Sequence, residues 1–390
     1  MVRKTPPMGW NSWNTFGSEI NEEVILRAAD SLVASGLAAC GYEYVVIDDC
    51  WSLPQRDAQG RLVPDPEKFP HGMKYVADYI HQKGLKFGMY SDAGPKTCAG
   101  YPGSGDHEHI DAATFASWDV DYLKYDYCHH EEMNLPGAVL YKRMGLALAN
   151  CGRDILFSAC SWGADDSYQW MKETGAHIWR STGDIQDAFS SVRNLIQQEI
   201  TRMEYNGQGC FNDLDMLIVG MNGEGNVAMG GCTPEEYALH FAFWCFFGSP
   251  LMIGSDLSKL DETSLRLLTN PDLIRIDQDS AYRQPFFLAP LEKNMERTTD
   301  QHYYKDYPGH APLLARILDD GSVAIGLFNL SEQTVTDVAN AGTIGVAPDC
   351  PKTLVAQDVF SGEQLPFVDG KLSITCAPHT CRVFIARLCD

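Results

Sequence analysis

The sequence predicts an α/β fold, a (β/α)8 (TIM) barrel followed by a small antiparallel β-sandwich domain. Over roughly the first 285 residues, a short run rich in Val, Ile, Tyr and Phe is followed by a helix-like stretch, and this pattern repeats eight times. Beyond that point the runs become short and alternating, with turn signals between them. A chain of 390 residues also exceeds the usual size of one compact core. We therefore expect a barrel domain at 1–285 and an antiparallel β domain at 286–390.

The first region contains the strands and helices of the predicted barrel. Strands that alternate with helices form a parallel sheet, and eight such units in about this length match a closed barrel. Helices are predicted at Glu22–Ala38 and Phe189–Tyr205, each with apolar residues along one face. The segments "NEEV" and "TPEEYA" start helices with an Asn or Thr cap. The eight strand-like runs are 7–13, 42–51, 86–94, 120–128, 155–162, 177–185, 210–219 and 247–256.

The C-terminal region shows the pattern of antiparallel strands. Its runs are short and alternate between apolar and polar residues, as in strands with one buried face. Asp319-Asp320-Gly321 and Asp369-Gly370 are turn signals between such runs. No linker of low complexity precedes this region, so we expect the two domains to pack tightly. The runs are "PLLARIL", "SVAIGLFNL", "VTDVAN", "TLVAQDVF", "KLSIT" and "RVFIARL".

Charge and hydropathy restrict the partners. The formal net charge is −22, which argues against nucleic acid or anionic lipid because phosphates would repel the protein. No apolar run approaches the ~20 residues that span a bilayer, and "MVRKTPPMGWNSW" lacks the apolar stretch of an export signal. We expect a cytoplasmic protein with a neutral substrate and no nucleic-acid or membrane partner; a secreted protein whose signal was removed is the alternative. A homo-oligomer is left open.

The cysteine count does not by itself indicate a disulfide-built fold or a metal site. There are 13 cysteines, but a chain of this length buries a large core without covalent cross-links. The nearest match to a metal-ligand spacing is Cys128-His129-His130. A pair of loop histidines explains it better, so we expect no metal.

Acidic and aromatic residues gather at the predicted strand ends. In a barrel of this kind the carboxyl ends of the strands face the active site. One aspartate there is most often a helix cap, but acids crowded on one rim repel each other and are poorly explained by structure alone. The set is Trp10, Trp13, Asp48, Asp49, Trp51, Tyr90, Asp92, Lys124, Asp126, Ser161, Trp162, Arg180, Asp184, Asp213, Asp215, Met216 and Asp256.

This composition points to a sugar substrate. Carboxylates accept hydrogen bonds from hydroxyls, indoles offer flat apolar platforms, and Lys and Arg donate to sugar oxygens. Glycoside hydrolysis needs two carboxyl groups beside the bond. Lys124 lies two residues before Asp126 and points the same way in a strand, so we expect its ammonium to keep Asp126 ionised, as a nucleophile requires. Asp184 follows Arg180 in a turn, and we expect it to be less ionised, as an acid requires.

Seven motifs resemble glycoside hydrolase family 27, which contains α-galactosidases and α-N-acetylgalactosaminidases. They span the whole barrel in the family's order and spacing, so the resemblance is highly specific. The motifs are "TPPMGWNSWN" (5–14), "YVVIDDCW" (44–51), "GMYSD" (88–92), "YLKYDYC" (122–128), "CSWG" (160–163), "WRSTGDI" (179–185) and "NDLDMLIVG" (212–220).

The resemblance implies a retaining exo-α-glycosidase that removes terminal α-galactosyl residues by double displacement, without a metal or organic cofactor. Asp126 matches the nucleophile and Asp184 the acid/base. Asp48 and Asp49 match residues on the 4- and 6-hydroxyls. Other residues match the lining of the galactose subsite, namely Trp13, Tyr90, Lys124, Arg180 and Asp215. Cys98 and Cys128 match a family disulfide beside the site.

Three departures from the family pattern carry expectations of their own. Tyr127 replaces an Asn after the nucleophile; we expect its side chain to point away from Asp126 and to have little effect. Relatives carry a second disulfide, and Cys50 matches one of its two cysteines. Ser18 stands at the position of the other, so this disulfide cannot form. The absence of this bridge makes the Cys98–Cys128 bridge an open question as well.

The third departure concerns the substrate. Where α-galactosidases of the family usually read C-E-W, this chain reads Cys160-Ser161-Trp162, with Ala164 further on. Ser161 and Ala164 resemble the α-N-acetylgalactosaminidase branch, in which small side chains leave room for a 2-acetamido group beside Trp162. The motif "WRSTGDI" is closer to the α-galactosidases. An α-galactosidase is the leading interpretation and an α-N-acetylgalactosaminidase the alternative; a β-L-arabinopyranosidase and a non-catalytic sugar-binding barrel are further candidates.

Overall fold

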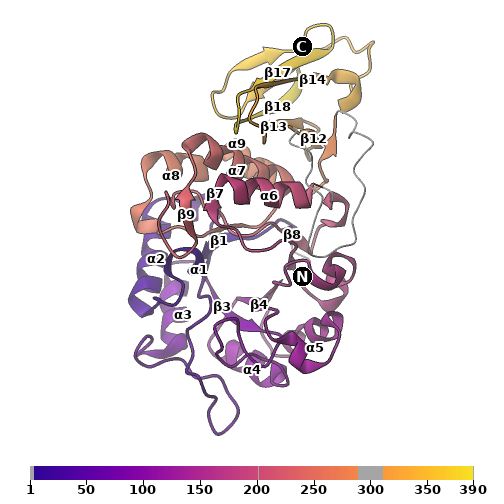
Figure 1. Ribbon diagram of the computed structural model, residues 1–390. Helices are drawn as coiled ribbons and strands as arrows, with labels where there is room; N and C mark the ends of the chain where they lie inside the picture. Colours follow the sequence, from indigo (N-terminus) through magenta and orange to yellow (C-terminus); the bar gives the residue numbers. More distant parts are fainter. Residues whose placement is uncertain (1–3, 201, 289–310, 390) are drawn as a thin grey trace.

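The computed structural model describes residues 4–200, 202–288 and 311–389. Eight parallel strands form one curled sheet in the order β10-β1-β2-β3-β4-β5-β6-β8, which confirms the predicted barrel (Figure 1). Each predicted run contains one of these strands, although the strands themselves are shorter because the runs extended into the loops. Their bounds are Met8–Asn11 (β1), Tyr44–Val46 (β2), Lys86–Asp92 (β3), Tyr122–Asp126 (β4), Leu156–Ala159 (β5), Ile178–Arg180 (β6), Phe211–Asp213 (β8) and Leu251–Ile253 (β10).

The segment after β8 brings the two ends of this sheet together. Leu217 forms a parallel bridge with Ile253 of β10. The Leu217 N–H donates to the carbonyl oxygen of Met252 at 2.7 Å, and its own carbonyl accepts from Gly254 at 2.9 Å. Inside the ring, a separate apolar cluster includes Tyr122 and Met216. The barrel is therefore a packed core, and its functional surface lies at the strand ends.

Apart from the short α1, the α-helices lie outside the sheet (Figure 1). The Asn21 side chain caps α2 by accepting from the Val24 N–H, and Thr233 with Glu236 forms a complete capping box on α7, as their segments predicted. Among the described helices, none has both the length and the apolar character needed to cross a bilayer. The α-helices are Trp13–Phe16 (α1), Glu22–Ala34 (α2), Gly72–Gln82 (α3), Glu108–Ser117 (α4), Gly137–Ala149 (α5), Phe189–Glu199 (α6), Pro234–Phe247 (α7), Glu262–Leu268 (α8) and Pro271–Asp277 (α9).

Two of the predicted helices end earlier than expected. Helix α2 stops at Ala34 rather than at residue 38, because Gly36 has a left-handed φ of +84°. Helix α6 stops at Glu199, and the last three residues of the predicted range form a 3-10 turn, η5 (Met203–Tyr205). The connection from β5 to β6 contains two 3-10 segments, η3 (Ala164–Gln169) and η4 (Met171–Thr174), in place of an α-helix.

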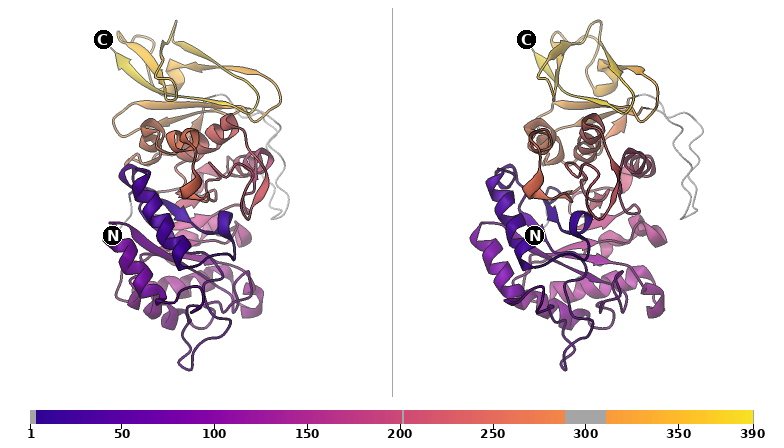
Figure 2. Two further views of the ribbon diagram at one scale, coloured as in Figure 1. Left: turned by 90° about the vertical axis from the view of Figure 1, so that its left-hand side faces the viewer. Right: turned by 60° about the vertical axis from the view of Figure 1, so that its left-hand side comes forward.

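The C-terminal region forms two antiparallel sheets packed face to face, as predicted (Figure 2). The larger sheet has the order β11-β12-β13-β18-β15-β16, and β14 pairs with β17 in the smaller one. The two shortest strands, β11 and β16, were not predicted. The bounds are Phe286–Phe287 (β11), Leu313–Ile317 (β12), Val323–Phe328 (β13), Val335–Asn340 (β14), Thr353–Asp358 (β15), Gln364–Pro366 (β16), Lys371–Cys376 (β17) and Cys381–Cys389 (β18).

Helix α7 joins the two regions (Figure 1). Phe328 of β13 packs on Phe243 and Phe246 of the helix, with ring centroids 5.1 and 5.5 Å away. The fully buried Arg316 of β12 donates to the carbonyl oxygens of Cys245 and Phe246 at the helix end. Because β11 already pairs with β12, we propose that the domain boundary lies near residue 285. Residues 289–310 and 390 of the predicted β domain lie outside the described residues.

Candidate active site

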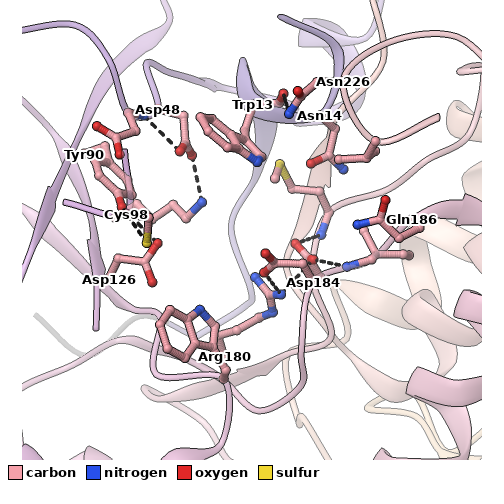
Figure 3. A pocket seen from close by; sticks show the side chains of 17 residues that line it. Trp13, Asn14, Asp48, Tyr90, Cys98, Asp126, Arg180, Asp184, Gln186 and Asn226 are labelled. Carbon is pink, nitrogen blue, oxygen red and sulfur yellow. Dashed lines mark hydrogen bonds and ion pairs between the residues drawn. The ribbon is translucent and has the colours of Figure 1, made fainter. Parts of the chain in front are cut away.

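A cavity of about 200 Å³ opens at the carboxyl ends of the barrel strands (Figure 3). Asp126 and Asp184 stand on opposite sides of it. A volume of this size accommodates one sugar ring rather than a long chain. The residues from the sequence prediction that line the cavity are Trp13, Asp48, Asp49, Tyr90, Cys98, Lys124, Asp126, Trp162, Arg180, Asp184, Asp215 and Met216.

Asp126 ends β4 and is held in place through both carboxylate oxygens. The Tyr90 hydroxyl of the neighbouring strand donates to Oδ2 at 3.0 Å, and the backbone N–H of Tyr127 donates to Oδ1 at 3.0 Å. The residue is only 6% exposed. Its carboxylate therefore has a fixed orientation toward the cavity, as a nucleophile requires.

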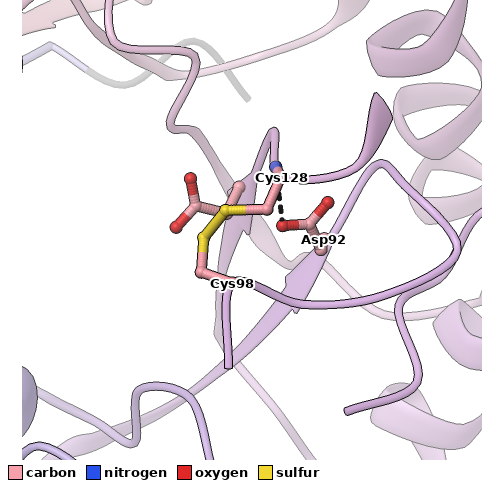
Figure 4. Close-up of side chains that lie close together, drawn as sticks. Asp92, Cys98 and Cys128 are labelled. Carbon is pink, nitrogen blue, oxygen red and sulfur yellow. Dashed lines mark hydrogen bonds between the residues drawn. A yellow bond between two sulfur atoms is a disulfide. The ribbon is translucent and has the colours of Figure 1, made fainter. Parts of the chain in front are cut away.

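A disulfide joins Cys98 and Cys128 (Figure 4), and both sulfurs lie within 4.8 Å of a carboxylate oxygen of Asp126. It answers the question that the sequence left open. Buried Asp92 accepts from the N–H groups of Gly94 at 2.7 Å and Cys128 at 3.0 Å, so it fixes the two loops that the disulfide joins. Burial, and then the nearby Asp126, raise the pKa of Asp92 well above its ordinary value.

The loop after β2 presents two adjacent carboxylates. Asp48 Oδ2 accepts from Lys124 Nζ at 2.7 Å and from Asn11 Nδ2 at 2.8 Å. Asp49 accepts from the backbone N–H groups of Cys50 at 2.7 Å and Ala99 at 3.0 Å. These bonds fix both acids at the cavity wall, where a pair of neighbouring sugar hydroxyls could donate to them.

Arg180 connects the acids on the other side of the cavity. Its Nη2 atom lies 2.8 Å from Asp184 Oδ1 and 2.8 Å from Asp215 Oδ2. Asp215 is buried and also accepts from the backbone N–H groups of Ile185 and Met216, both at 2.7 Å. The Asp184 side chain, by contrast, is 65% exposed. Asp184 is thus positioned at the cavity mouth, where a leaving group would depart.

The ionisation of the two catalytic candidates agrees with one expectation and differs from the other. Lys124 bonds to Asp48 rather than to Asp126. Burial raises the pKa of Asp126 to about 6; Lys124 opposes this rise, while Asp184 and Asp48 add to it. Partial burial would raise the pKa of Asp184, but Arg180 and then Lys124 outweigh it and hold this pKa below its ordinary value. Lys124 therefore lowers the pKa of Asp126, as expected, although burial outweighs it. The expectation that Asp184 is the less ionised acid is wrong, because the pKa of Asp184 is lowered while that of Asp126 is raised.

Six members of the predicted rim do not line the cavity; one is Ser161, and the other five serve the core or the loops. Trp10 and Trp51 are buried and donate to the backbone carbonyls of Ser255 and Tyr90. Asp92 lies behind the disulfide. The other two are Asp213, which lies in a small space beneath the cavity, and Asp256, which caps η6 (Leu257–Lys259) by accepting from the Ser258 N–H at 3.0 Å.

Three residues assigned to substrate binding also lie outside the lining. Cys128 sits behind Cys98 in the disulfide. Ser161 and Ala164 form a tight turn, in which the Ala164 N–H donates to the Ser161 carbonyl at 2.8 Å, and only Trp162 between them reaches the cavity. Ser161 is fully buried, and its hydroxyl has no hydrogen-bond partner among the described residues.

Further lining residues were missed by the sequence analysis. Asn14 and Ile185 lie within recognised motifs and Gln186 directly follows one, so all three could have been found from that position. Asn226 and Val227 belong to a glycine-rich segment without a recognised motif, whose backbone N–H groups donate to the carbonyls of Thr15 and Asn14 at 3.1 Å each.

One lysine spans the position of the missing second disulfide. Cys50 is free, as Ser18 predicts. The Lys68 ammonium donates to the carbonyl oxygens of both Ser18 and Cys50, each at 2.9 Å. It therefore ties together the two loops that a covalent bridge would join, without any dependence on redox conditions.

Among the described residues, one group brings several potential metal ligands within 4.8 Å of one another, Asp92, Cys98, Asp126 and Cys128. Both sulfurs in it belong to the disulfide. His129 and His130 are not part of it: His130 stacks on Tyr127 at a centroid distance of 3.6 Å, and His129 faces Glu132 at 3.5 Å. The histidine pair is thus accounted for by loop contacts.

Comparisons with known proteins agree on one family. A family model described as Alpha galactosidase A matches residues 5–279. An α-galactosidase from Cyamopsis tetragonoloba is 40% identical over 383 residues, 98% of this chain and 86% of that protein. The crystal structure of α-galactosidase I from Mortierella vinacea is 31% identical, with a TM-score of 0.86, over 98% of this chain and 97% of that one. A structure of an α-galactosidase from Saccharomyces cerevisiae with raffinose is 27% identical, with a TM-score of 0.82, over 99% and 98%.

Proposed function

The chain belongs to the α-galactosidase (melibiase) family, glycoside hydrolase family 27, and from this premise we propose that it hydrolyses terminal α-galactosyl residues with retention of configuration. The observation that carries the proposal is the pairing of Asp126 and Asp184 across one sugar-sized cavity. α-Galactoside oligosaccharides and glycoconjugates are the substrates that fit, because the cavity walls offer carboxylates, cations and two indoles to a neutral sugar.

The contacts support a role for each wall of the cavity. Asp48 and Asp49 accept hydrogen bonds from sugar hydroxyls, and Lys124 donates to one of them while it holds Asp48. Trp13 lies half-buried at the edge and offers its ring to the C–H face of the sugar. Arg180 and Asp215 hold the opposite wall. None of these groups needs a metal ion to act.

The reaction proceeds in two displacements. Asp126 attacks the anomeric carbon while Asp184 gives its proton to the departing oxygen, which leaves as an alcohol. Water then attacks the same carbon, its proton returns to Asp184, and the bond to Asp126 breaks. Asp184 must be protonated for the first step, although Arg180 pairs with it in the structure. A bound aglycone that keeps water and Arg180 away from Asp184 would raise its pKa and supply this form.

Retention is the first prediction. Proton NMR of fresh product from 4-nitrophenyl α-galactoside is expected to show α-galactose first, with the β-anomer appearing only by mutarotation. A covalent intermediate on Asp126 inverts the carbon twice and so preserves its configuration. Initial β-galactose would show a single displacement and would contradict the role of Asp126. The matching β-galactoside serves as the control and should not be cleaved.

The finer substrate choice at C2 carries the second prediction. Ser161 and Ala164 are small, and the buried Ser161 hydroxyl has no partner among the described residues. We propose that the enzyme also hydrolyses α-N-acetylgalactosaminides, because no bulky or charged side chain at these positions opposes a 2-acetamido group. Ser161→Glu together with Ala164→Leu should shift the preference toward plain α-galactosides by about 1–3 kcal/mol, the scale of one misfitted pocket group.

The ratio of kcat/KM for the two 4-nitrophenyl glycosides measures this shift. Ser161→Ala is the matched control, because it removes the hydroxyl without adding volume and should leave the ratio unchanged. The same ratio for Ala164→Leu alone provides a second measurement, since position 164 is only half-buried and tolerates a larger side chain. If N-acetylgalactosamine ligands are neither cleaved nor inhibitory, the loop beyond Ala164 closes the space and the enzyme is a strict α-galactosidase.

A further inference from the structure

Tyr127, the residue directly after the nucleophile, makes contacts that the catalytic steps do not use. Its side chain is 1% exposed and is absent from the cavity lining. Its hydroxyl donates to Asp165 Oδ2 at 2.6 Å. One face of its ring stacks on His130, with a centroid distance of 3.6 Å and an interplanar angle of 9°. The ring is therefore fixed, and the hydroxyl is aimed at a different loop.

Asp165 belongs to a loop whose backbone is strained. Trp162, Asp165 and Asp166 have φ angles of 56°, 54° and 49°. Side chains other than glycine rarely adopt this left-handed region, and each such residue costs free energy that surrounding contacts must offset. The loop conformation thus depends on what holds it from outside.

Two contacts hold Asp165 in particular. Tyr127 binds its carboxylate, and the Trp170 indole N–H donates to its carbonyl oxygen at 2.8 Å. Burial and then the Asp165 carboxylate raise the pKa of Tyr127 above its ordinary value, so the hydroxyl remains a donor. The Tyr127 ring also meets the Trp162 ring edge-on, with centroids 6.4 Å apart.

Trp162 is the part of this loop that lines the cavity. Its position is set by a backbone with unfavourable φ angles on one side and by the Tyr127 ring on the other. We propose that Tyr127 is a positioning residue: with Asp165 it forms a clasp between the nucleophile loop and the β5–β6 loop that holds Trp162 against the bound sugar. This inference rests on the proposed glycosidase function, and it replaces the expectation that Tyr127 has little effect.

The clasp predicts a particular kinetic pattern. An indole that contacts the sugar does so in the ground state and in the transition state alike, so its displacement weakens binding more than it slows chemistry. Tyr127→Phe keeps the ring and its stacking on His130 but removes the hydroxyl. We expect KM for 4-nitrophenyl α-galactoside to rise roughly three- to tenfold, with kcat changed less than about twofold.

A double-mutant cycle isolates the clasp. Asp165→Ala removes the acceptor, but it also adds backbone strain at the left-handed position 165. Combining it with Tyr127→Phe in a double-mutant cycle subtracts the contribution of this strain. The double variant should show no greater rise in KM than Asp165→Ala alone. Asp165→Asn keeps an acceptor oxygen and tolerates the left-handed backbone, so it should retain a KM close to that of the parent. Tyr79→Phe is the matched control, because Tyr79 donates to Asp30 on the distant surface at 3.0 Å.

Hydrogen exchange provides a measurement that does not need activity. Residues 161–170 should exchange faster in Tyr127→Phe than in the parent, while Tyr79→Phe leaves this segment unchanged. Unchanged exchange, or a loss of kcat at constant KM, would overturn the clasp. A parent protein that cleaves no glycoside would overturn the proposed function instead, and the exchange experiment would still decide whether Tyr127 holds the loop.

Discussion

Asp126→Asn is expected to lower kcat on the order of 10⁴-fold or more while leaving the fold intact. An amide has neither the charge nor the basicity to form the covalent bond to the anomeric carbon. Tm should not fall, because Asp126 is 6% exposed and crowded by other acids, so replacing a carboxylate by a neutral group relieves repulsion. Initial rates on 4-nitrophenyl α-galactoside and a thermal melt measure the two effects together.

Asp256→Asn is the matched control for this variant. Asp256 also follows a barrel strand, but its carboxylate caps η6 outside the cavity, so the variant should keep full activity. Azide offers a second check in Asp126→Gly, which leaves room for the anion. Azide would attack from the side of the missing carboxylate and displace the alcohol, which yields β-galactosyl azide. A tenth of the parent activity in Asp126→Asn would show that another group is the nucleophile.

Asp184→Asn is expected to show an effect that depends on the leaving group. Nitrophenolate departs without a proton, so the first displacement should survive and give a burst, followed by slow turnover because water lacks its general base. Raffinose has a sugar leaving group that requires protonation, and its hydrolysis should fall about 10²–10⁴-fold. Rapid-mixing and steady-state rates on the two substrates measure this contrast. Azide should now yield α-galactosyl azide, since it attacks the covalent intermediate from the opposite face.

The pH profile of the same variant separates a chemical role from a structural one. In the parent, kcat/KM should fall as the pH drops through about 6, because Asp126 becomes protonated and cannot attack. The Asp184 charge raises the pKa of Asp126. Asp184→Asn should therefore move the acidic limb of the kcat/KM profile to lower pH. Asp187→Asn is the control: its carboxylate accepts from Tyr237 at 2.8 Å within the fold, and it should show neither the shift nor the dependence on leaving group. An equal loss on both substrates would contradict the acid/base role.

Local patterns in the sequence were enough to predict much of the architecture. The alternation of apolar runs and helix-like stretches identified all eight barrel strands, since a buried parallel strand needs a nearly continuous apolar run wherever it lies. Capping segments located the starts of α2 and α7 for a similar reason, because a cap acts within one turn. The C-terminal ends of the helices were predicted less well. The stop at Ala34 depends on the left-handed Gly36, and the helix-like pattern continued past it.

The sequence by itself indicated most of the residues that meet at the cavity, since barrel strands deliver their terminal side chains to one rim. It did not determine how those residues pair or ionise. Lys124 lies two residues from Asp126 in the chain but bonds to Asp48 across the sheet, and the pKa of Asp126 depends on burial by several elements. Tyr127 and Asp165 are far apart in sequence, and only the folded chain brings them into contact. Partners and local dielectric are properties of the packed molecule, because Coulomb energies and desolvation depend on three-dimensional distance.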